Sequence, residues 1–115
     1  MEKTEAKIQQ EIVMFVRNEL REGIIFSVPN ETESKMDAIR KKATGMMAGV
    51  SDLIYITENR VLFIETKTST GRQGESQKKF QSKVEALGYI YILVRSLDDF
   101  KNMLYNIKIT SQDNK

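Results

Sequence analysis

The stretch from residue 49 to residue 67 constrains the fold of this chain more than any other. It holds two apolar runs separated by the pair Glu58-Asn59, and an asparagine favours the backbone of a two-residue hairpin loop. The pattern therefore predicts two antiparallel strands in which Thr57 pairs with Arg60. Three charged residues interrupt the apolar runs, namely Asp52, Glu65 and Lys67.

These charged residues would come together in the predicted hairpin. Side chains alternate between the two faces of a strand, so Glu65 and Lys67 point to the same face. The register set by the turn places Asp52 directly opposite Glu65. Like charges in that position destabilise a sheet unless a cation lies between them, and we interpret the arrangement as a metal site. The alternative is that these are ordinary charged residues at strand ends, whose side chains reach solvent.

No cysteine or histidine occurs among the 115 residues. This composition excludes disulfides, thiol nucleophiles, Cys/His zinc sites and imidazole acid-base chemistry, so any catalysis must use carboxylates, lysine and a metal. A net charge of +2 is only weak support for a nucleic-acid partner. The charged N-terminus and the lack of a long apolar segment predict a cytoplasmic protein that does not span a membrane.

The rest of the chain alternates between helical and strand patterns. Helices are predicted over residues 4–21, 35–42, 75–87 and 96–105, strands over residues 24–28 and 89–94, and an edge strand or a partner contact at residues 107–110. Because a helix connects the second hairpin strand to residues 89–94, those two strands should be parallel. We expect an α/β fold with a mixed central sheet of about four strands flanked by helices. Residues 1–110 would form a single domain, and residues 111–115 a disordered tail.

Five segments of the chain carry a resemblance to a known family. They are EAKIQ (residues 5–9), PNE (29–31), GMMAGVSD (45–52), FIETK (63–67) and GRQGESQ (71–77). In this order they resemble the VRR-NUC domain nucleases, which have a restriction-endonuclease-like fold with an αβββαβ core. The chain looks like a short, stand-alone, phage-type member, which would act in the host cytoplasm if phage-encoded. One departure is Ser51, where the family commonly has proline; it leaves the following carboxylate in place but should loosen the start of the strand.

The resemblance implies metal-dependent hydrolysis of DNA phosphodiester bonds. Asp52 and Glu65 are hard oxygen ligands suited to Mg²⁺ or Mn²⁺, and the carbonyl oxygen of Thr66 can complete the site. In these nucleases an acid from the first helix approaches the metal, and Glu5 matches that position, where it would bind directly or through water. Glu2 is a weaker candidate. The alternative for Glu5 is that its side chain extends past the end of the helix into solvent.

Two further residues belong to the predicted catalytic site. Lys67 would position the nucleophile and stabilise the transition state. Gln77 matches the family's glutamine and would orient water or a phosphate oxygen. In sequence, a buried amide that satisfies backbone groups would look the same as this catalytic glutamine.

Basic residues lie before and after the predicted site. Those on the helix over residues 35–42 could contact DNA or lie on a solvated face, and the same two interpretations hold for the polar loop after residue 67. The candidate DNA contacts are Lys35, Arg40, Lys41, Lys42 and Arg72.

The predicted partner is DNA, and the short family members resemble Holliday junction resolvases. Because a four-way junction is resolved by two symmetric cuts, we expect a homodimer. The alternatives are a nuclease for flaps or linear DNA and a non-catalytic nucleic-acid-binding module on the same fold. Acids beside a lysine favour the enzyme, since a module that only binds phosphate has no use for carboxylates that repel it. Candidate interface residues are Met46, Met47, Tyr89, Tyr91, Met103, Tyr105, Ile107 and Ile109.

Overall fold

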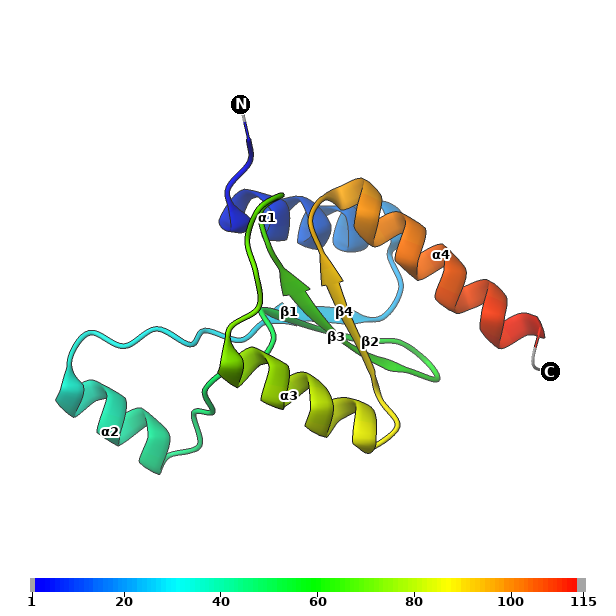
Figure 1. Cartoon of the computed structure of the whole chain (residues 1–115). Helices are drawn as coiled ribbons and strands as arrows, with labels where there is room; N and C mark the ends of the chain where they lie inside the picture. The colour runs from blue at the N-terminus through cyan, green and yellow to red at the C-terminus, as the bar shows by residue number, and fades with distance from the viewer. Residues whose placement is uncertain (1, 114–115) are drawn as a thin grey trace.

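The computed structural model (Figure 1) describes the backbone of residues 2–113 and the side chains of residues 2–108. In this part of the chain no helix is both long and apolar enough to cross a membrane. The elements in chain order are α1 (Glu5–Phe15), the π-helical turn η1 (Val16–Leu20), β1 (Ile24–Ser27), α2 (Lys35–Ala43), β2 (Leu53–Ile56), β3 (Val61–Thr66), α3 (Glu75–Ala86), β4 (Ile90–Val94) and α4 (Leu97–Asp113).

The four strands form one mixed sheet in the order β1-β2-β3-β4. Strand β2 is antiparallel to both β1 and β3, whereas β3 and β4 are parallel. Helices α1 and α4 lie on one side of the sheet and α3 lies on the other (Figure 1). The predicted α/β fold with a mixed sheet of about four strands is therefore confirmed.

The hairpin of β2 and β3 has the predicted register. The amide of Thr57 donates to the carbonyl oxygen of Arg60 (2.8 Å), and Leu53 pairs with Ile64. One step further along this register, the residue opposite Glu65 is Asp52. The turn chemistry and the two-residue period of a strand were enough to fix this pairing.

Apolar side chains fill the space between the sheet and the two helices α1 and α4. The ring of Phe15 on α1 meets that of Phe100 on α4 edge to face, with centroids 6.3 Å apart. On the opposite face, the ring of Phe63 on β3 packs against that of Phe80 on α3, with centroids 5.6 Å apart. The buried apolar core consists of Ile8, Ile12, Val16, Ile25, Leu53, Tyr55, Leu62, Ile64, Ile92, Val94, Phe100 and Leu104.

The ends of the first and last helices differ from the sequence-based expectation. The first helix, expected to be regular, ends in the π-helical turn, and Arg21 closes it with φ 56°. The edge strand predicted at residues 107–110 is wrong, because α4 continues through them and Ile107 extends the stripe of Phe100 and Leu104 against the core. The backbone of residues 111–113 also continues α4, and the rest of the expected tail, residues 114–115, lies outside the described part.

Candidate metal centre

Three carboxylates come together at the end of the sheet where β2 begins and β3 ends. Glu5 is the first residue of α1, Asp52 directly precedes β2, and Glu65 lies in β3. One carboxylate oxygen from each lies within 4.8 Å of those of the other two. The structure thus brings together three of the acids that the sequence suggests as metal ligands. Glu5 is exposed and Asp52 half-buried, whereas Glu65 is fully buried.

Glu65 is the most unusual acid in the chain. Its side chain is 1% exposed, and Oε2 accepts a hydrogen bond from Nε2 of Gln77 at 3.0 Å. Its other oxygen, Oε1, is buried and has no hydrogen-bond partner in the described part of the chain. An unsatisfied buried polar group costs about 1–3 kcal/mol, and more if it is charged. Burial, and next the charge of Asp52, raise the pKa of Glu65 to about 8.

The donor set fits a divalent cation. A cation among three carboxylates would give the orphaned Glu65 Oε1 a partner and would offset the repulsion between the acids. All the available ligand atoms are hard oxygens, which Mg²⁺ and Mn²⁺ prefer.

Asp52 is held in place by its neighbours in the sheet. Its Oδ2 accepts hydrogen bonds from both the amide and the hydroxyl of Thr66, each at 2.8 Å. The preceding residue, Ser51, is buried and donates its hydroxyl to the carbonyl oxygen of Leu53 (3.2 Å), which ties down the strand start that we expected to be loose.

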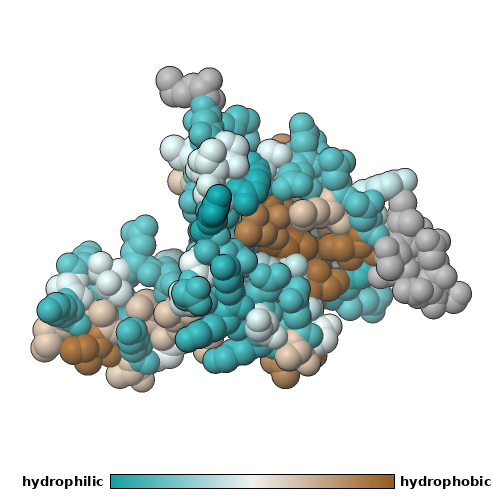
Figure 2. Space-filling view, in the orientation of Figure 1, coloured by the Kyte–Doolittle hydropathy of each residue, from teal (hydrophilic) through white to brown (hydrophobic). Residues whose placement is uncertain are grey.

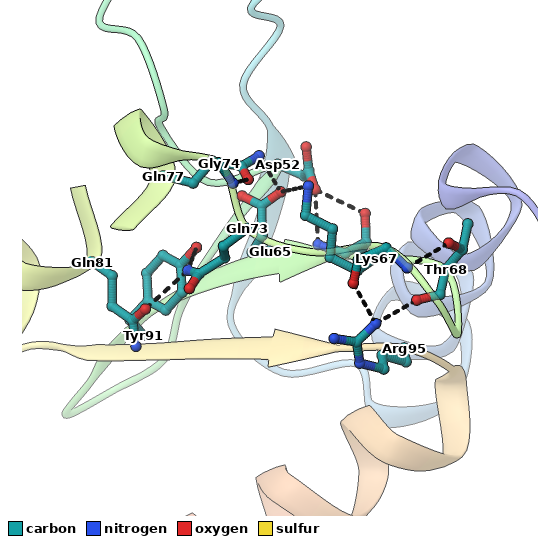
Figure 3. A network of polar contacts seen from close by, with 12 residues as sticks. Asp52, Glu65, Lys67, Thr68, Gln73, Gly74, Gln77, Gln81, Tyr91 and Arg95 are labelled. Carbon is teal, nitrogen blue, oxygen red and sulfur yellow. Dashed lines mark hydrogen bonds and ion pairs between the residues drawn. The ribbon is translucent and has the colours of Figure 1, made fainter. Parts of the chain in front are cut away.

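Lys67 and Gln77 contact Glu65 from two directions (Figure 3). Nζ of the buried Lys67 lies 3.8 Å from Glu65 Oε2. Gln77, on the first turn of α3, accepts from the amide of Gly74 at 2.8 Å while it donates to Glu65. The side-chain amide of Gln77 therefore satisfies one backbone group and also hydrogen-bonds one of the three acids. Its role in orienting water or a phosphate oxygen stays a prediction.

Gly49 brings the loop before Asp52 into close contact with the start of α3. Gly49 has φ +83°, and a Cβ placed on it would lie 2.2 Å from the carbonyl oxygen of Ser76. Its lack of a side chain therefore lets the start of α3 approach closely. The loop before Asp52 therefore lies directly against the backbone at the start of α3.

Arg95 and Glu2 hold the loop that follows Lys67, and no sequence signal indicated Arg95. Nη1 of Arg95 donates to the carbonyl oxygens of Thr68 (2.6 Å) and Gly71 (2.7 Å), as Figure 3 shows in part. Glu2 accepts from the amide of Ser69 at 2.8 Å, so this weaker metal candidate is engaged with the loop and is not one of the three clustered acids.

The candidate DNA contacts do not gather at the acids. Four of them belong to α2, which has no buried residue and lies apart from the sheet (Figure 1). Lys41 is engaged there with Asp37 (3.1 Å) and with the carbonyl oxygen of Glu31 (2.8 Å). Arg72 is exposed in the loop after β3. The other members on α2 are Lys35, Arg40 and Lys42.

The raised pKa of Glu65 predicts a pH-dependent stability of the metal-free protein. The unfolded carboxyl group ionises near its ordinary value of 4.5, whereas the folded one keeps its proton until about pH 8. The unfolded state therefore gives up its proton first, and the free energy of unfolding should fall by a few kcal/mol, on the order of 2–5, between these pH values. Urea unfolding in chelator at pH 5, 6.5 and 8 measures this loss. Glu65→Gln, which cannot ionise, should lose much less, and equal pH profiles for the two proteins would contradict the assignment.

Known proteins resemble this chain in fold more than in sequence. No protein-family model matches it, and no curated protein sequence matches it. A solved structure described as a "VRR_NUC domain protein" superposes with a TM-score of 0.73 and 19% sequence identity, over 91% of this chain and 88% of that one. At this identity the likeness speaks for the fold alone. The chain therefore has the mixed α/β fold of a VRR_NUC domain protein, as its sequence motifs predict.

Proposed function

We propose that this protein is a metal-dependent endonuclease that hydrolyses DNA phosphodiester bonds. The observation that carries the proposal is the cluster of Glu5, Asp52 and Glu65, with a buried carboxylate oxygen that has no partner in the described residues. Burying an acid beside another acid is costly, and a divalent cation removes that cost. The fold shared with a VRR_NUC domain protein supports a nuclease domain.

The three acids and the carbonyl oxygen of Thr66 would hold Mg²⁺ or Mn²⁺. When bound, such a cation lowers the pKa of water and offsets the charge that builds up on the phosphate. Lys67 places a positive charge 3.8 Å from Glu65. From there its ammonium group would bind a phosphate oxygen and stabilise the charge of the transition state. Through its hydrogen bond, Gln77 would hold the Glu65 carboxylate in the orientation needed to bind the cation.

The alternative within the same fold is a non-catalytic module that binds nucleic acid. The buried acids weigh against this alternative, since carboxylates repel phosphate unless a cation intervenes. The exposed basic residues of α2 and Arg72 would contact the DNA backbone at a distance from the acids.

The substrate we favour is a four-way DNA junction, cut by a homodimer. Two symmetric cuts require two sites, and the described residues hold one cluster of three acids. Apolar side chains gather on the surface over β4, between α3 and α4 (Figure 2), and such patches are typical of protein interfaces. Of the candidate interface residues, Met47, Tyr89 and Tyr105 are exposed.

The remaining interface candidates are less suited to that role. Met46 is half-buried. Tyr91 is buried against Phe80 and belongs to the fold, and Met103 and Ile107 are partly buried against the core. The side chain of Ile109 lies outside the described part.

Binding and cleavage of a DNA panel test this proposal. Light scattering should give a particle of about twice the 13.3 kDa chain mass. In gel shifts at one salt concentration, a four-way junction should bind more tightly than duplex of the same length, and with Mg²⁺ it should be cut faster than flapped or linear DNA. A monomer at micromolar concentration with equal affinity for duplex and junction would favour a single-cut nuclease. Binding without cleavage of any substrate would favour the non-catalytic module.

A further inference from the structure

The side chain of Thr66 is not part of the ligand set considered so far, yet it touches a member of it. Its hydroxyl donates to Oδ2 of Asp52 at 2.8 Å, and its backbone amide donates to the same oxygen at 2.8 Å. Thr66 is 0% exposed, so solvent does not compete for these bonds. Two donors from one buried residue thus converge on one carboxylate oxygen.

The two bonds have different requirements. The amide is available with any residue except proline at position 66, whereas the hydroxyl requires serine or threonine. With a single donor, the Asp52 carboxylate is free to tilt and rotate about that bond. With a second donor from the side chain, its orientation is fixed, and both bonds leave Oδ1 to other partners. Hydrogen bonds to a charged carboxylate are also stronger than neutral ones.

We propose that the hydroxyl of Thr66 positions Asp52 for cation binding. This inference rests on the proposed function, because it assumes that the cluster of Glu5, Asp52 and Glu65 binds a divalent cation. Groups that hydrogen-bond to a metal ligand orient it before the metal arrives, and losing one typically weakens binding by about 10–100-fold. The hydroxyl would act by holding Asp52, and the carbonyl oxygen of Thr66 remains the part that would contact the cation.

Thr66→Val tests the inference, since valine keeps the volume and the β-branch but lacks the hydroxyl. Binding of Mn²⁺, without DNA, is measured by the loss of the free-ion signal in electron paramagnetic resonance. The dissociation constant should rise by about 10-fold or more in Thr66→Val. Thr66→Ser restores the hydroxyl and should return the constant to near the wild-type value. The matched control is Thr57→Val, which removes a hydroxyl at the hairpin turn of the same sheet and should leave Mn²⁺ binding unchanged.

The outcomes separate this inference from the proposed function. If the wild-type protein takes up no Mn²⁺, the metal site is refuted and the role of Thr66 with it. If the wild-type protein binds Mn²⁺ and Thr66→Val binds it equally well, only the role of Thr66 is refuted. Circular dichroism in chelator checks that each variant is folded. Should valine prevent folding, Thr66→Ser and Thr66→Ala give the same comparison, because both lack the methyl group and only serine keeps the hydroxyl.

Discussion

Replacing Asp52, Glu65 or Lys67 with alanine is expected to reduce DNA cleavage at least about 100-fold, the usual effect of losing one group that stabilises a transition state. Each change removes either a proposed cation ligand or the one buried ammonium group beside the acids in the described residues. The fold should survive, because the hairpin register depends on backbone pairing and apolar side chains. Above about pH 8, where Glu65 is ionised, loss of its repelled carboxylate should even raise thermal stability in chelator.

Initial rates on the best-cleaved DNA measure this prediction, with circular dichroism to verify folding. The matched control is Glu58→Ala, which removes an exposed carboxylate from the hairpin turn, outside the acid cluster. This variant should cleave like the wild-type protein. If Glu65→Ala keeps more than a few per cent of the wild-type rate, Glu65 is not a catalytic residue and the proposed site is wrong.

Cleavage is also expected to depend entirely on Mg²⁺ or Mn²⁺. The chain contains no histidine or cysteine, so its side chains offer no imidazole base and no thiolate nucleophile. Ca²⁺ prefers six to eight flexible ligands and longer bonds, so it should occupy the acid cluster without supporting hydrolysis.

Rates with each ion and with excess chelator measure this dependence. Gel shifts in Ca²⁺ serve as the control, because DNA binding should persist under conditions where cleavage fails. Undiminished cleavage in excess chelator would rule out a metal mechanism.

The central hairpin could be predicted from the sequence because its signals are local. The pair Glu58-Asn59 sets the turn, and the two-residue period then fixes which residues face each other. The meeting of Asp52 with Glu65 follows from that register alone. Glu5 could be added only through the family resemblance, since helical periodicity gives the face of a helix but not its distance from a strand.

Other features depend on contacts that short-range patterns do not contain. Arg95 holds the carbonyl oxygen of Thr68, 27 residues earlier in the chain, and nothing in its own neighbourhood indicates this. Residues 107–110 alternate apolar and polar side chains like a strand, yet packing of Ile107 against the core extends the helix through them. The hydrogen bond from the hydroxyl of Thr66 to Asp52 likewise has no signal in the sequence around it.

The most direct test of the central claim is to locate a bound cation. Crystals of the wild-type protein grown with Mn²⁺ should show an anomalous scattering peak within bonding distance of carboxylate oxygens of Glu5, Asp52 and Glu65. The same peak should be missing from crystals of Glu65→Ala. A peak that contacts none of these acids, or no peak at millimolar Mn²⁺ in the wild-type crystals, would contradict the account.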